Sequence, residues 1–202
     1  MTGLGPWHSE RLIYRAIEPE DEPVLLSISS DPEAFSNSAP FLPQPRSKRS
    51  ATQHREWLEG ALISAMICLP PPTSGSQDDT AMRPNPVGLI HLHGSDPRLA
   101  HHRHGDIGIN VRKTYQGQGY GTEAIKWVLH WGFQYAGLHR IELGAFEYNP
   151  GAVKLYERIG FVPEGKRRDW VWFNGRYWDV HMFSMLEHEW RERFGEKQNS
   201  SN

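Results

Sequence analysis

The stretch QGQGYG, residues 116–121, is the feature of this sequence that most narrows the choice of fold. It follows DIGINV, residues 106–111, where apolar side chains alternate as in a strand with one buried face. It precedes residues 122–136, whose apolar side chains recur at the spacing of an amphipathic helix. Each glycine costs roughly 0.5–1 kcal/mol relative to alanine when ordered in a helix or strand. We therefore expect a strand, a glycine turn and a helix, in which the turn is either a phosphate cradle or a tight connection.

The rest of the chain alternates between helix and strand signals. Asn149 and Pro150 suit the N-cap and first turn of a helix that Gly160 closes. Asn174 and Gly175 form a strong two-residue hairpin signal between two aromatic-rich strands. Further strands are expected at residues 12–15, 87–94 and 140–146. Further helices are expected within residues 17–31, where acidic residues mark the helix start, over residues 50–68 and over residues 187–194.

Length and composition place the chain in a broad class. Its 202 residues suit one domain, predicted over residues 1–195, with a mobile polar insert at 70–86 and a disordered tail at 196–202. The net charge of −2 gives no basic footprint for nucleic acid. A single cysteine, Cys68, excludes a disulfide framework and a cysteine zinc site. With no membrane span either, the sequence predicts a cytoplasmic protein, and a nuclear one would look the same.

Two common phosphate-binding loops fit the glycine turn poorly. A Walker A loop ends in Gly-Lys-Ser/Thr, whereas Gly121 is followed by Thr and Glu. The dinucleotide fingerprint is G-x-G-x-x-G, whereas this turn reads G-x-G-x-G, and no acid is well placed for the ribose about twenty residues later. Nucleotide-dependent chemistry on a Rossmann-like fold is therefore disfavoured.

A third pattern fits. Q-x-x-G-x-G after a strand that ends in valine resembles the acetyl-CoA signature of the GNAT N-acetyltransferases. NPGAVKLYERIGF, residues 149–161, resembles the second half-motif of that superfamily. The stretch that starts at RLIYR and the ending NGRYWDVHMFSML resemble its RimJ/RimL-like branch, so the likeness covers about residues 10–190. It implies an α+β GNAT fold, with a mostly antiparallel twisted sheet flanked by helices and two splayed parallel central strands.

The resemblance implies acetyl-CoA as cosubstrate and assigns residues to it. Main-chain N–H groups of the glycine turn would hold the pyrophosphate, and free edge groups of the strand before it would bond the pantetheine. The Val111 N–H would stabilise the charge on the acetyl carbonyl. The implied cofactor-binding residues are Ile109, Val111, Gln116, Gly117, Gln118, Gly119, Tyr120, Gly121, Thr122, Asn149 and Lys154.

The implied reaction is direct acetyl transfer to a primary amine, with Tyr156 as general acid toward the departing sulfur. A base must first deprotonate the ammonium, and Asp106, Glu142 and Glu147 are candidates, with water, Glu33 or a histidine as alternatives. Because Cys68 lies on the expected helix away from any nucleophile motif, we expect no covalent enzyme intermediate. The acceptor is a protein N-terminus or a small amine such as a polyamine. The rival hypothesis is an acetyl-CoA-binding protein of this fold without catalysis.

Two other clusters support weaker expectations. His91 and His93 lie on one face of a strand, but no cysteine joins them, and we expect no metal site there. The aromatic side chains of the hairpin favour core packing or a homodimer, with a substrate-side wall as the alternative. They are Trp170, Trp172, Tyr177 and Trp178.

Overall fold

A computed structural model describes residues 6–71 and 84–195 of the chain. The predicted tail, residues 196–202, and most of the predicted insert, residues 70–86, lie outside this part. The end of the predicted insert is wrong, because Asn85 and Pro86 begin strand β3, Asn85–Gly94. Pro86 can join the strand because it pairs with Cys68 where the register of the ladder shifts, a position at which a missing N–H is tolerated.

The described residues group into two compact units. The first comprises Met1–His93 and Ile107–Val128, and the second comprises Gly94–Asp106 and Leu129–Asn202. Strand β4, His104–Val111, contributes residues to both. Helix α4, Tyr120–His130, and the π-helical turn η4 that continues it, Trp131–Tyr135, together match the helix expected over residues 122–136.

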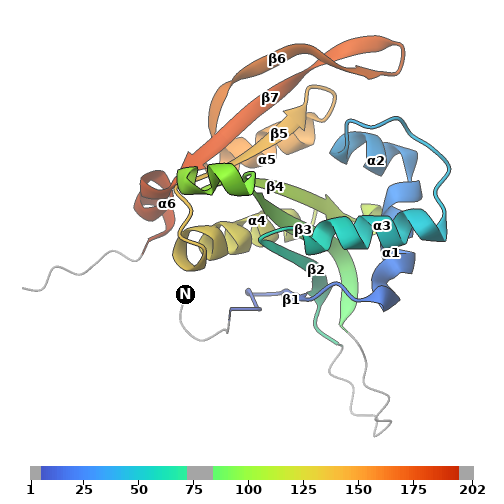
Figure 1. The fold of residues 1–202 in the computed structure, drawn as a ribbon, viewed down its shortest axis with the longest axis horizontal. Coiled ribbons are helices and arrows are strands. Elements are labelled where there is room, and N and C mark those ends of the chain that lie inside the picture. The colour runs from blue at the N-terminus through green and yellow to red at the C-terminus, as the bar shows by residue number, and fades with distance from the viewer. Residues whose placement is uncertain (1–5, 72–83, 196–202) are drawn as a thin grey trace, which may run out of the picture. The chain divides into compact units, whose positions relative to one another are not determined.

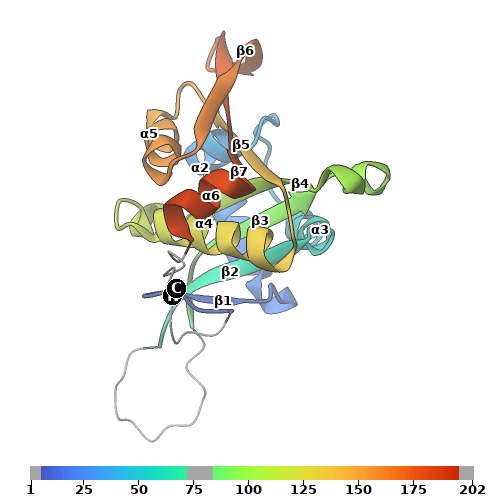
Figure 2. The ribbon, with the colours of Figure 1, turned by 90° about the vertical axis from the view of Figure 1, so that its left-hand side faces the viewer.

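In the first unit, β1, Ile13–Arg15, and β2, Ile63–Leu69, pair antiparallel, and β2 pairs antiparallel with β3. Figure 2 shows the three strands side by side. The short helix η1, Pro19–Asp21, leads into α1, Glu22–Ser30, which is followed by α2, Pro32–Ser38, and α3, Lys48–Glu59. Their apolar faces meet the strands in a core of Leu25, Ile28, Leu58, Met66, Cys68 and Leu89.

The helix expected over residues 50–68 is only half right. Helix α3 ends at Glu59 and Gly60 caps it, and residues 63–69 form β2. The run from Ala65 to Cys68 is buried without a break, because β2 is covered on both faces and needs no polar alternation. Such a run cannot be told from a buried helix by periodicity alone. Cys68 therefore lies on a strand, and burial raises the pKa of its thiol to about 11.

In the second unit, β4 pairs in parallel with β5, Arg140–Phe146, and β5 pairs antiparallel with β7, Arg176–Leu186. Strand β6, Val162–Phe173, pairs only with β7 among the described residues, and the two form the long hairpin of Figure 1. The helices are α5, Pro150–Ile159, and α6, Glu187–Phe194. The expected loop before β4 contains a further 3-10 helix, η2, Pro97–His102, because the Asp96 side chain caps it and Pro97 opens it.

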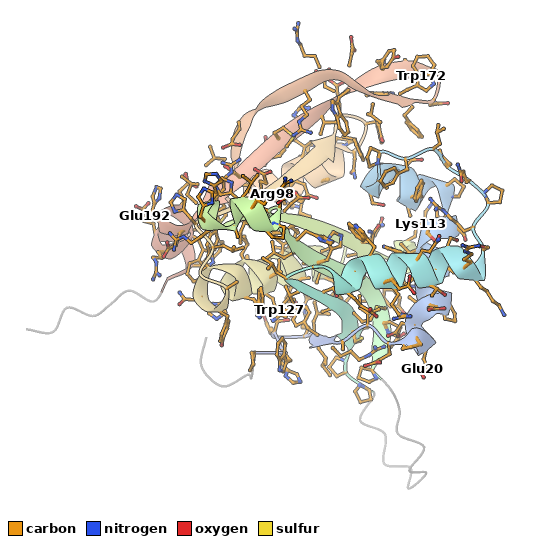
Figure 3. The ribbon with its side chains drawn as sticks, viewed as in Figure 1. Glu20, Arg98, Lys113, Trp127, Trp172 and Glu192 are labelled. Atoms are coloured by element: carbon orange, nitrogen blue, oxygen red, sulfur yellow. The ribbon has the colours of Figure 1, made fainter. Side chains whose placement is uncertain are left out.

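The hairpin places its aromatic side chains in two environments. Trp178 packs on Tyr148, and both lie against the small apolar cluster of Phe146, Val171 and Val180. Trp170, Trp172 and Tyr177 are about half exposed, and Trp172 lies near the end of the hairpin in Figure 3. Core packing therefore accounts for one of the four aromatic residues singled out in the sequence. The homodimer stays a prediction.

The expected fold class, α+β with a mixed and mostly antiparallel sheet, is confirmed. Hydrogen-bonded strands run in the order β1-β2-β3-β4 and continue from β4 in the order β5-β7-β6. The parallel ladder between β4 and β5 covers three residue pairs, from His104 with Arg140 to Asp106 with Glu142. The splay of these strands beyond Asp106 stays a prediction. In the part of the chain that the structure describes, no helix has both the length and the apolarity to cross a membrane.

Candidate active site

Two residues of the glycine turn have a backbone conformation that favours glycine. Gly117 and Gly119 have φ angles of +73° and +85°, a left-handed conformation that side chains with a Cβ rarely adopt. Both residues are exposed, and among the described residues, apart from Gly117 and its two chain neighbours, no atom lies within 4 Å of the place that a Cβ on Gly117 would take. The turn thus leaves room for a ligand to approach its main chain.

Two glutamine side chains of this turn form hydrogen bonds with nearby main-chain carbonyl oxygens. The Gln116 amide donates to the Val111 carbonyl oxygen at 2.8 Å, and the Gln118 amide donates to the Thr114 carbonyl oxygen at 3.1 Å. Helix α4 begins directly afterwards at Tyr120, so N–H groups of residues 118–122 lie where a helix has donors without intrahelical partners. Together with the helix dipole, these donors suit a pyrophosphate.

Ile109 and Val111 both lie on β4 and are half buried. Position 108, between Ile107 and Ile109 of β4, requires a glycine, because a Cβ on Gly108 would lie only 2.1 Å from Nε2 of His91. The Val111 carbonyl is already engaged by Gln116, whereas the next residue, Arg112, donates its N–H to the Val87 carbonyl oxygen at 2.9 Å. The residues before the turn are thus fixed by β3 and by the turn itself.

Asp106 has an unusual carboxyl group. Its side chain is exposed, yet loss of hydration raises its pKa to about 6, and the charge of Glu142 adds to the shift while Arg167 opposes it. The group is exposed, but neighbouring protein atoms still remove part of its hydration. A carboxylate with a pKa near neutrality is well matched to general base catalysis.

Tyr156 lies on α5 and is buried, with 8% of its surface exposed. Its ring packs near Phe161 and, in an edge-to-face arrangement, near Phe183. Burial raises its pKa to about 12, and the negative charge of Asp106 contributes to the shift. Within residues 6–71 and 84–195, its hydroxyl makes no hydrogen bond. The phenol is therefore protonated at neutral pH and available to a ligand.

The other two predicted acids are engaged by basic neighbours. Arg140 donates to Glu142 at 2.8 Å and also binds Glu164, whose pKa falls to about 2 mainly because of this arginine. Glu147 lies 3.6 Å from the ammonium of Lys166. Glu142 points away from the face of β5 on which Ile141 and Leu143 are buried, as the alternation predicts. Of the predicted acids, Asp106 is thus the one that influences Tyr156 electrostatically.

Asn149 is the N-cap of α5, as predicted. Its side-chain oxygen accepts from the Ala152 N–H at 3.2 Å, and Gly160 ends the helix with a left-handed φ of +109°. Lys154 lies on the exposed side of the same helix. The helix therefore positions Asn149 and Lys154 together with Tyr156.

Replacing the Asn149 side chain should destabilise the chain through this cap. We expect Asn149→Ala to lower the free energy of unfolding by about 1 kcal/mol, because the Ala152 N–H loses its side-chain acceptor and keeps only its bond to the Asn149 carbonyl oxygen. Asn149→Ser keeps a good capping oxygen and should lose only a few tenths of that amount. Urea denaturation measures both, and equal losses for the two variants would contradict a capping role.

His91 and His93 pack in the first unit on a tryptophan that the sequence did not link to them. His91 and His93 lie on one face of β3, as expected, and both rings pack on Trp57. Burial lowers the pKa of His91 to about 3 and also lowers the pKa of His93, so both are neutral at pH 7. Among the described residues, no group of three or more His, Cys, Asp or Glu side chains could hold a metal ion.

The sequence profile of the Acetyltransferase (GNAT) domain matches residues 11–162, about three quarters of the chain. The chain belongs to the GNAT acetyltransferase family. Its activity is therefore acetyl transfer from acetyl-CoA to an amino group. The exposed glycines with positive φ and the N–H groups at the start of α4 suit a cosubstrate that carries a pyrophosphate.

Relatives agree with the family assignment, and a solved structure agrees with the fold. An uncharacterized N-acetyltransferase, YokL of Bacillus subtilis, is 28% identical over 94% of this chain and 97% of its own length. A spermidine N(1)-acetyltransferase of Vibrio cholerae is 36% identical over 46% of this chain and 53% of its own. The structure of a spermidine N-acetyltransferase from Vibrio cholerae, solved with CoA and spermine, superposes with a TM-score of 0.74 over 90% of this chain and 99% of that one, at 24% identity.

Proposed function

We propose that this GNAT enzyme transfers the acetyl group directly to a primary amine, with Asp106 as general base and Tyr156 as general acid. The observation that carries this proposal is the electrostatic coupling of the two groups inside the second unit. Burial and the charge of Asp106 keep Tyr156 protonated, and crowding around Asp106 brings its pKa close to neutral. Both pKa values are raised, so at neutral pH the Asp106 carboxyl can accept a proton while the Tyr156 phenol holds one, and the two groups suit opposite roles in proton transfer.

Cosubstrate binding in this proposal uses the residues that the motifs indicate. N–H groups of Gln118, Gly119, Tyr120, Gly121 and Thr122 bind the pyrophosphate. Main-chain groups of Ile109 bond the pantetheine, and Asn149 and Lys154 contact the same cosubstrate from α5. The acetyl thioester supplies an electrophilic carbonyl carbon and a thiolate leaving group. The Val111 N–H donates to the carbonyl oxygen as negative charge develops there.

The proton transfers balance with Asp106, Tyr156 and solvent water. Asp106 accepts a proton from the acceptor ammonium, directly or through one water. The amine nitrogen then bonds to the carbonyl carbon, the carbon–sulfur bond breaks, and Tyr156 donates its phenolic proton to the sulfur. The second proton of the amine returns Tyr156 to its neutral form through solvent, and Asp106 releases the proton that it accepted to bulk water. Glu142 and Glu147 stay predicted alternatives to Asp106, although each already binds a basic side chain.

A direct route is also supported by the only cysteine of the chain. Cys68 is fully buried on β2, and its pKa of about 11 keeps the thiol protonated. The thiolate is the nucleophilic form of cysteine, so this side chain is unsuited to carry an acetyl group between two half-reactions.

A small amine is the acceptor class that we propose first. Two curated spermidine N(1)-acetyltransferases, from Vibrio cholerae and Escherichia coli, align with 46% and 44% of this chain. The second candidate is a protein N-terminus, which is favoured by 34% identity over 110 residues to a putative ribosomal N-acetyltransferase, YdaF of Bacillus subtilis. That alignment covers 54% of this chain and 57% of the relative.

An acceptor panel separates these candidates. CoA thiol release is measured with acetyl-CoA and, in turn, spermidine, a monoamine of similar length, and peptides with free and blocked N-termini. We expect the highest kcat/KM for a small amine. A higher kcat/KM for the free peptide, lost on blocking its N-terminus, would establish the second candidate and contradict the first.

A further inference from the structure

Arg11 lies near the N-terminus of the sequence, but its side chain contacts the glycine turn. It precedes β1, and its Nη1 donates to the Gln118 carbonyl oxygen at 3.0 Å. Its guanidinium also lies 4.9 Å from the ring centre of Tyr120, and its Nη2 lies 3.1 Å from the place of a Cβ on Gly119. All these residues belong to the first unit. Arg11 thus covers three successive residues of the turn.

The hydrogen bond to Gln118 fixes one peptide plane of the turn. In a trans peptide the C=O and the following N–H point in opposite directions. By holding the Gln118 carbonyl on its own side, Arg11 turns the Gly119 N–H to the other side. A glycine with φ of +85° offers little resistance to a flip of this plane, so the plane depends on an external partner.

Arg11 also neutralises a carboxylate at the start of α4. Glu123 accepts from Nε of Arg11 at 2.8 Å, from the Arg11 N–H at 2.7 Å and from the Ser9 hydroxyl at 2.6 Å. Burial alone would raise the pKa of Glu123, but these bonds lower it overall, so the group stays ionised. Without its arginine, this charge would oppose a phosphate at the same helix end.

We propose that Arg11 is a positioning residue for the pyrophosphate loop. It orients the Gln118–Gly119 peptide and balances Glu123, so that the turn is prepared for an anion before acetyl-CoA arrives. This inference rests on the proposed use of the turn for the cosubstrate. The sequence offers no local signal for it, because Arg11 and Gln118 lie 107 residues apart.

Calorimetric titration with two probes tests the proposal. CoA carries the pyrophosphate, and pantetheine lacks it. We expect Arg11→Ala to weaken CoA binding about 10-fold, as for loss of charge-assisted hydrogen bonds, and to leave pantetheine binding unchanged. Arg98→Ala is the matched control, because Arg98 is another exposed arginine paired with a carboxylate, Asp96, but belongs to η2. It should bind both probes as the wild type does.

Two further variants separate orientation from charge. Arg11→Lys keeps the charge but lacks the planar fork that reaches Glu123 and Gln118 together, so it should weaken CoA binding by an intermediate factor. Adding Glu123→Gln to Arg11→Ala should restore part of the CoA affinity. A thermal melt reports folding, and Arg11→Lys decides the question if Arg11→Ala does not fold.

The outcomes distinguish this inference from the proposed function. CoA affinity within twofold of wild type in Arg11→Ala, or equal losses for CoA and pantetheine, would overturn the positioning role. Failure of the wild-type chain to bind CoA would instead overturn the use of the turn for the cosubstrate.

Discussion

Tyr156→Phe should lower kcat by about 100-fold or more while the affinity for acetyl-CoA stays nearly constant. General acid catalysis contributes about 10²–10⁴ to a rate, and phenylalanine removes only the proton that the thiolate needs. The ring contacts with Phe161 and Phe183 survive the change, so the packing around α5 should hold. Steady-state thiol release gives kcat, and calorimetric titration with acetyl-CoA in the absence of an amine gives the affinity.

Tyr177→Phe is the matched control for this variant. Tyr177 lies on β7 with 57% of its surface exposed, and loss of its hydroxyl should leave kcat unchanged. If Tyr156→Phe keeps more than half of the wild-type kcat, with the chemical step shown to limit turnover, Tyr156 is not the acid. A parallel loss of CoA affinity would point to a binding role.

Asp106→Asn should remove the acid limb of the pH profile of kcat/KM. In the wild type, the rate should rise with pH up to about pH 6, because only the ionised carboxyl accepts a proton and its pKa is about 6. The asparagine variant should be about 100-fold slower at pH 8 and should lack that limb. Glu142→Gln and Glu147→Gln should keep it. If one of these variants loses the limb and Asp106→Asn keeps it, the base is misassigned.

Stability provides an internal control for the Asp106 variant. The folded-state pKa of about 6 lies above the value of about 3.9 for an unperturbed aspartate, so the folded chain binds the proton more tightly. Folding stability from this group therefore falls as pH rises from 4 to 6. The Asp106→Asn variant has no carboxylate to keep ionised in a poorly hydrated place, so it does not lose this stability at high pH. It should therefore unfold at the same or a higher urea concentration than the wild type at pH 8. Its loss of activity then cannot result from unfolding.

Local chemistry made much of the fold predictable. The Asn149 cap, the Gly160 stop and the Asn174-Gly175 turn each fix their backbone by their own conformational preferences, and the structure has a helix start, a helix end and a hairpin there. Gly117 and Gly119 adopt positive φ angles, which glycine takes without steric cost. Where the backbone is determined within a few residues, the sequence predicts it.

Tertiary packing explains what the sequence did not reveal. Residues 63–69 became a strand because both faces of β2 are covered, which local periodicity does not report. The shifted pKa of Asp106 arises from crowding and from Glu142 on the paired strand, 36 positions away along the chain. The roles of Asp106, Tyr156 and the cosubstrate residues were implied by family likeness, and they stay predictions that the proposed variants test.

One measurement tests the central claim most directly. The chain is incubated with acetyl-CoA with and without the best amine of the panel, and thiol release, the mass of the amine and the intact mass of the protein are followed together. Direct transfer predicts thiol release only with amine, one acetyl group on the amine for each thiol, and an unchanged protein mass. An acetylated protein that forms without amine and then passes its acetyl group to the amine would contradict the account.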